Sequence, residues 1–257
     1  SDIQIPVSLK LVVLPGIPLV QPGDCIVTLI IDSLKKARLN LLEGDILVIA
    51  QKIISKSEGR YVKLDSIDPS KRSIELAKVI KKDPRLVELI LRESLGVLRH
   101  RDGVIVTENL KGVIMANAGI DQSNVESDDN SEQVLLLPRD PDKSAFKIRE
   151  KIKREIDVNI GVIINDSVGR AWRNGTIGTA IGISGIPAII DFRGQPDLFG
   201  KPLRTSQEAI SDELSSAASL LQGQASEGMP VVIIKGYLSS KISPQVGTST
   251  GISDLIR

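Results

Sequence analysis

Residues 160–175 read IGVIINDSVGRAWRNG, an aliphatic run that ends in the polar pair Asp166-Ser167. Its Ile and Val content and its polar and glycine borders predict a buried strand over Ile160–Asn165. Ligand sites of α/β proteins gather at the carboxyl ends of strands, where Asp166 and Ser167 would lie. A carboxylate beside a hydroxyl suits a Mg²⁺ or Mn²⁺ ion that carries substrate phosphates. The structural alternative is a capped turn with solvated arginines and a core tryptophan, Trp172.

Two arginines follow this strand. Arg170 and Arg173 lie three residues apart on either side of the tryptophan. Guanidinium groups bind carboxylates bidentately, so both are candidates for binding an acidic acceptor or glutamate.

Outward from this segment, short aliphatic strands alternate with amphipathic helices. Further strands are predicted at Leu11–Leu14, Asp45–Ala50, Val104–Thr107, Val113–Ala116, Val134–Leu137, Ile186–Asp191 and Val231–Lys235. Helices are predicted after Asp24, Asp68, Asp83 and Asp140, each with the aspartate as cap, and from about Thr205 to Leu221. The irregular order of elements favours an α+β fold of mixed sheets with packed helices. No linker divides the chain, so residues 1–257 are expected to form a single domain, with a division into two lobes left open.

Composition excludes several classes of protein. The chain has 257 residues, with 33 Lys+Arg against 32 Asp+Glu, and only one Trp, two Tyr and three Phe. This balance argues against nucleic-acid binding, which needs cations and stacking rings. One Cys and one His leave no ligands for a zinc cluster, so a metal would need oxygen ligands. No apolar run is long enough to span a membrane, and no GxSxG or Walker A motif is present.

Three more segments have compositions that suit a ligand site. GIPLVQPGD (16–24) is a stiff turn against which a base could rest, AQKIISKSEGR (50–60) offers cations and hydroxyls for a phosphate, and ANAGIDQSN (116–124) offers oxygen ligands. Each also has an ordinary structural interpretation, respectively a connector, a solvated hairpin and an Asx-rich turn.

Taken in order, these segments resemble the coenzyme F420-0:L-glutamate ligase, or γ-glutamyl ligase, family in its standalone form. Similarity extends over about residues 11–236. The other matching stretches are LRHRDGVIVTE (98–108), LPRDPDKSA (137–145), NDSVGRAWRNG (165–175), DFRGQPDLFGKPL (191–203) and GQASEGMPVV (223–232).

The resemblance implies an unusual ligase fold, neither P-loop nor ATP-grasp, in a cytoplasmic homodimer. It implies that GTP activates the lactyl carboxylate of coenzyme F420-0 as an acyl phosphate, which the amine of L-glutamate then attacks. Further glutamates follow through γ-linkages, and GDP and phosphate are released.

Carried over position by position, the resemblance also implies a set of site residues. The nucleotide would meet Ile17, Pro18, Leu19, Val20, Gln51, Lys52, Lys56, Asn124, and the loop Gln222, Gly223, Gln224, Ala225, Ser226, Glu227, Gly228, Met229. Two divalent cations, Mg²⁺ or Mn²⁺, would be held by Asp121, Asp166, Ser167 and Gln224, and a monovalent cation such as K⁺ is allowed for. No general base is assigned.

Two other functions fit the same residues. One is a nucleotide-dependent ligase that acts on another acidic acceptor. The other is a non-catalytic module that binds GTP and a divalent metal.

Overall fold

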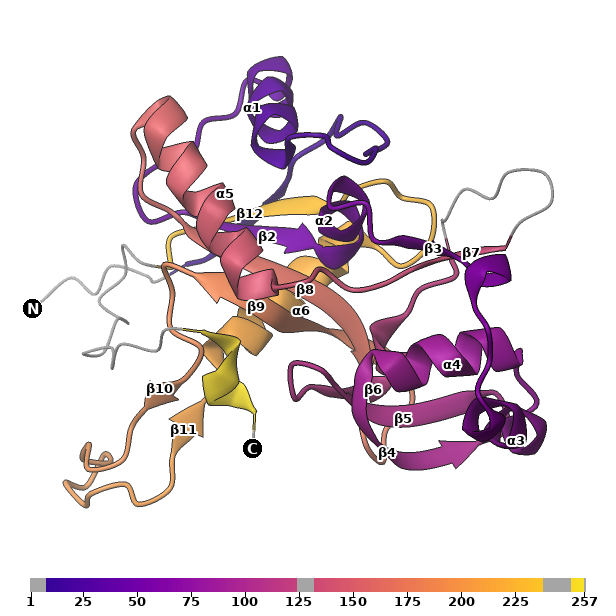
Figure 1. Cartoon of the computed structure of the whole chain (residues 1–257). Coiled ribbons are helices and arrows are strands. Elements are labelled where there is room, and N and C mark those ends of the chain that lie inside the picture. The colour runs from indigo at the N-terminus through magenta and orange to yellow at the C-terminus, as the bar shows by residue number, and fades with distance from the viewer. Residues whose placement is uncertain (1–7, 124–131, 238–250, 257) are drawn as a thin grey trace, which may run out of the picture.

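The computed structural model describes residues 8–123, 132–237 and 251–256. Its centre is a five-stranded sheet of order β1-β12-β2-β8-β9 (Figure 1). The strands are β1 (Lys10–Val13), β12 (Val231–Lys235), β2 (Ile46–Ala50), β8 (Gly161–Gly169) and β9 (Thr176–Ser184). Only β2 and β8 pair in parallel; the other neighbours are antiparallel. The sheet is therefore mixed, as predicted for an α+β fold.

Helices cover both faces of this sheet, because its strands are apolar on both sides. Leu47 and Ile49 of β2 pack in one core with α1 (Ile26–Ala37) and α5 (Pro141–Ile156). Ile46 and Val48, which alternate with them, pack in a second core with α6 (Ile210–Gln222). A two-stranded ribbon of β10 (Ile190–Asp191) and β11 (Gln207–Glu208) leads into a long hairpin that projects from the molecule (Figure 1).

A second group of elements lies beside the central sheet (Figure 1). It contains α3 (Lys71–Ile80), α4 (Pro84–Arg92) and the sheet β4-β5-β6, formed by Ser94–Arg101, Val104–Asn109 and Ile114–Ala116. These elements share a third apolar core. The strands β3 (Tyr61–Lys63) and β7 (Gln133–Leu135) pair on the way into and out of this group. The single-domain prediction for residues 1–257 stays a prediction.

Two of the four predicted aspartate caps are wrong. Asp83 and Asp140 do accept first-turn amides, from Arg85 and Lys143. However, Cys25 occupies the cap position of α1, and Ser70 caps α3 through the amide of Ser73. Asp24 instead accepts the amide of Gln21, within the turn that precedes the helix.

Some elements were not predicted. The helix α2 (Gln51–Ser57) begins directly after β2, so the structural alternative of a solvated hairpin for this segment is wrong. The strands β3, β4, β9 and β11 were also missed.

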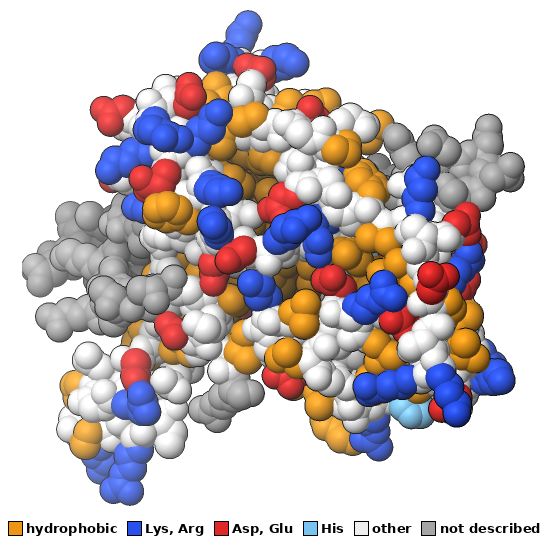
Figure 2. Space-filling view, in the orientation of Figure 1, with side chains coloured by type: hydrophobic (Ala, Val, Ile, Leu, Met, Phe, Trp, Pro, Cys, Tyr) orange, Lys and Arg blue, Asp and Glu red, His pale blue; other side chains and the backbone are white. Residues whose placement is uncertain are grey.

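The surface carries both charges. Figure 2 shows Lys and Arg interspersed with Asp and Glu over this face, with no continuous field of one sign. Within the described ranges, no helix combines the length and apolarity that a membrane crossing requires.

Candidate functional site

A cavity of about 780 Å³ opens at the carboxyl ends of the parallel strands β2 and β8. Five segments that are distant in the sequence line it: residues 17–20, 50–56, 115–123, 165–169 and 222–230. All the described residues predicted to bind nucleotide or metal lie in this lining: Ile17, Pro18, Leu19, Val20, Gln51, Lys52, Lys56, Asp121, Asp166, Ser167, Gln222, Gly223, Gln224, Ala225, Ser226, Glu227, Gly228 and Met229. Asn124 lies outside the described residues.

The helix α2 brings polar side chains to this cavity because it starts where the buried strand β2 ends. Gln51 is buried, and its Oε1 accepts a hydrogen bond of 2.9 Å from the hydroxyl of Ser55. The Nζ atom of Lys52 lies 2.7 Å from Oδ2 of Asp121 and 3.1 Å from the hydroxyl of Ser123. Lys52 thus joins α2 to the segment that carries one of the predicted metal ligands.

The environment of the Asp166 carboxyl group disfavours its ionised form. Burial raises its pKa from 3.8 to about 6, and the nearby carboxylate of Asp121 acts in the same direction. The amide of Ser167, which donates to Oδ1 at 2.8 Å, and the charge of Lys52 oppose this rise only in part. An ionised carboxylate at such a place is stabilised by a bound cation.

Asn165 is a further cavity residue that was not among the site residues predicted from the sequence. It ends the apolar part of β8 and is only 4% exposed. Its Nδ2 donates to Oε1 of Gln222 at 2.8 Å. Nε2 of Gln222 faces the carbonyl oxygens of Pro230, at 3.1 Å, and Val48, at 3.4 Å. Oδ1 of Asn165 has no partner in the described structure.

These groups suit a hard cation better than a soft one. In the described parts of the chain, no three His, Cys, Asp or Glu side chains come together as a metal site. The cavity instead offers the carboxylates of Asp121, Asp166 and Glu227, serine hydroxyls, amide oxygens and one buried oxygen without a donor. Mg²⁺ and Mn²⁺ accept such oxygen sets and usually complete them with water or substrate phosphates.

The loop after α6 closes one side of the cavity. Gly223 ends the helix with a φ of 74°, in a region of backbone conformation that favours glycine. A Cβ at this position would lie 2.3 Å from the carboxyl carbon of Glu227, so that side chain would have to shift, and the positive φ itself favours glycine. Glu227 accepts the amide of Ala225 at 2.7 Å, and backbone amides lower its pKa.

Arg170 and Arg173 do not line the cavity. Both are exposed on the connection between β8 and β9, just beyond the lining residue Gly169. Trp172 between them is 96% exposed, so the alternative of a core tryptophan is wrong.

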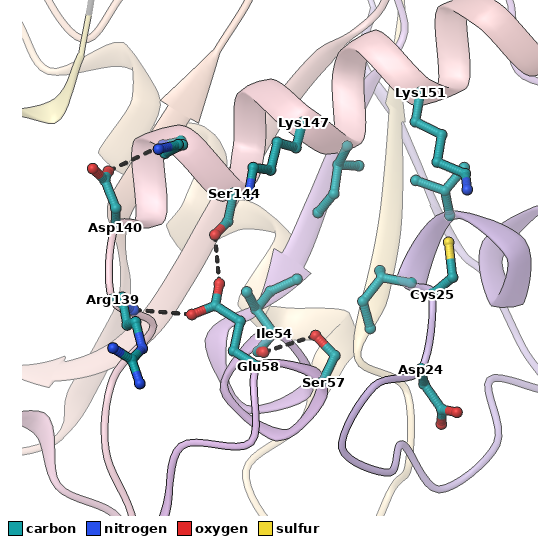
Figure 3. A pocket seen from close by; sticks show the side chains of 14 residues that line it. Asp24, Cys25, Ile54, Ser57, Glu58, Arg139, Asp140, Ser144, Lys147 and Lys151 are labelled. Atoms are coloured by element: carbon teal, nitrogen blue, oxygen red, sulfur yellow. Dashed lines mark hydrogen bonds between the residues drawn. The ribbon is translucent and has the colours of Figure 1, made fainter.

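A smaller cavity of about 520 Å³ lies between α1, α2 and α5. Figure 3 shows Glu58 between the hydroxyl of Ser144, at 2.5 Å, and the amide of Arg139, at 3.0 Å. Lys151 points from α5 toward the thiol of Cys25 (Figure 3). Burial opposes ionisation of this thiol, but hydrogen bonds from Thr28 and Lys151 outweigh it and lower its pKa. None of the predicted site residues lines this second cavity.

Comparison with known proteins gives a consistent result. The family model of F420-0:gamma-glutamyl ligase matches residues 16–236. The coenzyme F420:L-glutamate ligase of Methanothermobacter thermautotrophicus is 46% identical over 230 residues, which is 90% of each chain. The enzymes of the same name from Methanocaldococcus jannaschii, 46% identical over 78% of each chain, and Archaeoglobus fulgidus, 40% identical over 86% of this chain and 85% of its own, are also similar. The chain belongs to the F420-0:gamma-glutamyl ligase family.

Proposed function

We propose that this protein uses GTP to join L-glutamate to the lactyl carboxylate of coenzyme F420-0. The observation that carries the proposal is the convergence of five separate segments on one cavity, with Asp121, Asp166 and Lys52 together in its wall. Family membership supports glutamate ligation. The use of GTP and the route through an acyl phosphate are our inference.

The proposed chemistry proceeds in two displacements. A carboxylate oxygen of the acceptor attacks the γ-phosphorus of GTP, and the bond to the β-phosphate oxygen breaks, which gives an acyl phosphate and GDP. The amine of glutamate then attacks the acyl carbon, phosphate leaves, and the amine releases a proton to solvent or phosphate. Repetition at the γ-carboxylate of the product would extend the chain.

The residues of the cavity suit this phosphoryl transfer. The cations of Lys52 and Lys56 can offset charge on the phosphates, since both side chains belong to α2 and both line the cavity. Ile17, Pro18, Leu19 and Val20 provide the stiff edge for the base and ribose. The loop 222–229 would cover the nucleotide and limit access of water to the acyl phosphate.

Divalent cations would be held by Asp121, Asp166, Ser167 and Gln224. When bound, they would supply positive charge against the triphosphate. The raised pKa of Asp166 supports this assignment, because its charged form is only partly compensated by the protein alone. A K⁺ ion would be an addition to this set.

Recognition of the acceptor and assembly of the dimer would use the exposed segments next to the cavity. Arg170 and Arg173 lie just past Gly169, where they could meet an acidic group at the cavity mouth. Leu198 and Phe199 are 100% and 89% exposed in the long hairpin between β10 and β11. Apolar side chains at such a position suit a subunit contact, and we expect a cytoplasmic homodimer.

The direct test is mass spectrometry of coenzyme F420-0 incubated with the protein, L-glutamate, GTP and Mn²⁺. We expect products heavier by one or more glutamyl residues, formed only when GTP is present. The matched reactions omit GTP, replace it with ATP, or replace glutamate with aspartate. Product from aspartate alone would support a ligase for another acid, and tight GTP binding without any product would support a binding module.

A further inference from the structure

Asn165 places a buried oxygen without a hydrogen-bond partner among the described residues in the wall of the cavity. Its neighbours across the sheet are Ala50 on β2 and Ala180 on β9. An amide buried between such residues carries a cost unless its donors and its oxygen are satisfied. The small neighbours leave its polar atoms to be satisfied from the cavity side.

The orientation of the Asn165 amide follows from its hydrogen bonds. Nε2 of Gln222 must face the carbonyl oxygens of Pro230 and Val48, because a flipped amide would set oxygen against oxygen. Oε1 of Gln222 is therefore an acceptor, and only Nδ2 of Asn165 can donate to it, at 2.8 Å. Two fixed carbonyl groups thus determine that Oδ1 of Asn165 is the atom left without a donor.

The surroundings of this oxygen favour a cation as its partner. Asn165 directly precedes Asp166 and lines the same cavity as Asp121, Ser167 and Gln224. Oδ1 of Asp121 already accepts from the amide and hydroxyl of Ser123, and its Oδ2 faces Lys52. A divalent ion takes about six oxygen ligands, and Oδ1 of Asn165, unlike Oδ1 of Asp121, accepts no hydrogen bond from the described residues that would compete with the ion.

We propose that Oδ1 of Asn165 is a direct ligand of a divalent cation in this cavity. The backbone carbonyl groups of Val48 and Pro230 orient the side chain of Gln222. Gln222 in turn orients the side-chain amide of Asn165, so that Oδ1 of Asn165 faces the ion. This inference rests on the cation site of the proposed function and adds a ligand to it.

The test measures metal binding directly, without turnover. Mn²⁺ is titrated into the full-length protein by calorimetry, with thermal unfolding as a check that each variant folds. Removing groups that merely support a metal's ligands costs about 10–100-fold in affinity, so Asn165→Leu should weaken Mn²⁺ binding by at least about tenfold. Asn165→Asp keeps a ligand oxygen but loses the amide donor that Gln222 accepts, so it should bind Mn²⁺ more tightly than Asn165→Leu does.

Thr107→Val is the matched control. The Thr107 hydroxyl is the other buried side-chain oxygen without a partner in the described structure, but it does not line the cavity. Its replacement should leave Mn²⁺ affinity unchanged.

The outcomes separate this inference from the proposed function. If the native protein binds Mn²⁺ and Asn165→Leu binds it equally well, the ligand role of Asn165 is overturned while the cation site stands. Weakening by Asn165→Asp as severe as that by Asn165→Leu also overturns it. If the native protein binds no Mn²⁺, both the cation site and this ligand are rejected.

Discussion

Replacing Asp166 with Asn should stabilise the metal-free protein while it removes activity. The native carboxylate ionises with a pKa of about 6 because burial disfavours its charge, against 3.8 for an unperturbed aspartate. A shift of about two units corresponds to about 3 kcal/mol between the two protonation states. Asparagine matches the shape of the carboxylate without its charge, so the variant avoids this cost.

The sign of the pH dependence follows from proton binding. Between pH 3.8 and about 6 the native state holds a proton on Asp166 that the unfolded state has lost. Native stability therefore falls as pH rises through this window, and the loss is complete above it. The gain from Asp166→Asn should be about 1 kcal/mol at pH 4.5 and approach about 3 kcal/mol at pH 8.

The assay is thermal or urea unfolding of both proteins in EDTA at the two pH values. For a chain of this size each kcal/mol moves the Tm by about 2–4 °C. Mn²⁺ at a hundred times its Kd should then stabilise the native protein by about 2.7 kcal/mol and leave the variant unchanged. A stability difference that does not vary with pH would refute the electrostatic reasoning. Near-normal GTP-dependent activity in the variant would refute the metal assignment.

Three further predictions concern the surface, the second cavity and the core. Leu198→Asp should convert a homodimer into monomers if the hairpin forms the interface, and light scattering would show this change; a dimer of unchanged mass would place the interface elsewhere. Lys151→Met should raise the pKa of the Cys25 thiol and slow its alkylation by iodoacetamide near pH 7.5, because it removes one of the groups that favour the thiolate. Gly182→Ala should lower the free energy of unfolding by about 1–3 kcal/mol, because its Cβ would lie 2.4 Å from a backbone carbon of Pro141.

Each of these variants has a matched control. The control for Leu198→Asp is Leu220→Asp, which makes the same change on α6 at a leucine that is 83% exposed. Lys153→Met removes a lysine of α5 that does not line the second cavity. Gly96→Ala adds a methyl group at a position with nothing within 4 Å, so stability should change little. If a control variant has the same effect as its test variant, the cause proposed for that prediction is wrong.

The sequence predicted those parts of the fold whose cause is local. Apolar strands such as Val231–Lys235 and caps such as Asp83 depend on a few neighbouring residues, and the structure confirms both. Strand β9 was missed because Gly178 and Gly182 weaken its pattern. Close packing against helices accounts for both glycines. A Cβ at Gly178 would lie 2.5 Å from Ser215 of α6, and a Cβ at Gly182 would lie 2.4 Å from Pro141 of α5.

The same distinction holds for the candidate site. Asp166-Ser167 was selected because a polar pair at a strand end is visible in the sequence. Asn165 was not selected. Its oxygen is left without a donor because its amide nitrogen donates to Gln222, which lies 57 positions later along the chain. Arg170 and Arg173 had suitable chemistry, but the strand carries them past the lining of the cavity.

The order of strands in the central sheet has a consequence for how the chain folds. The first strand, Lys10–Val13, pairs with Val231–Lys235, which also separates it from Ile46–Ala50. During synthesis, the strand Lys10–Val13 must therefore wait for a partner made more than two hundred positions later, and such distant pairing is slow and leaves unpaired strand edges exposed. The cavity includes residues 17–20 and 222–230, so it forms only when this closure is complete. Nucleotide binding by a nascent or truncated chain would thus report that the sheet has closed.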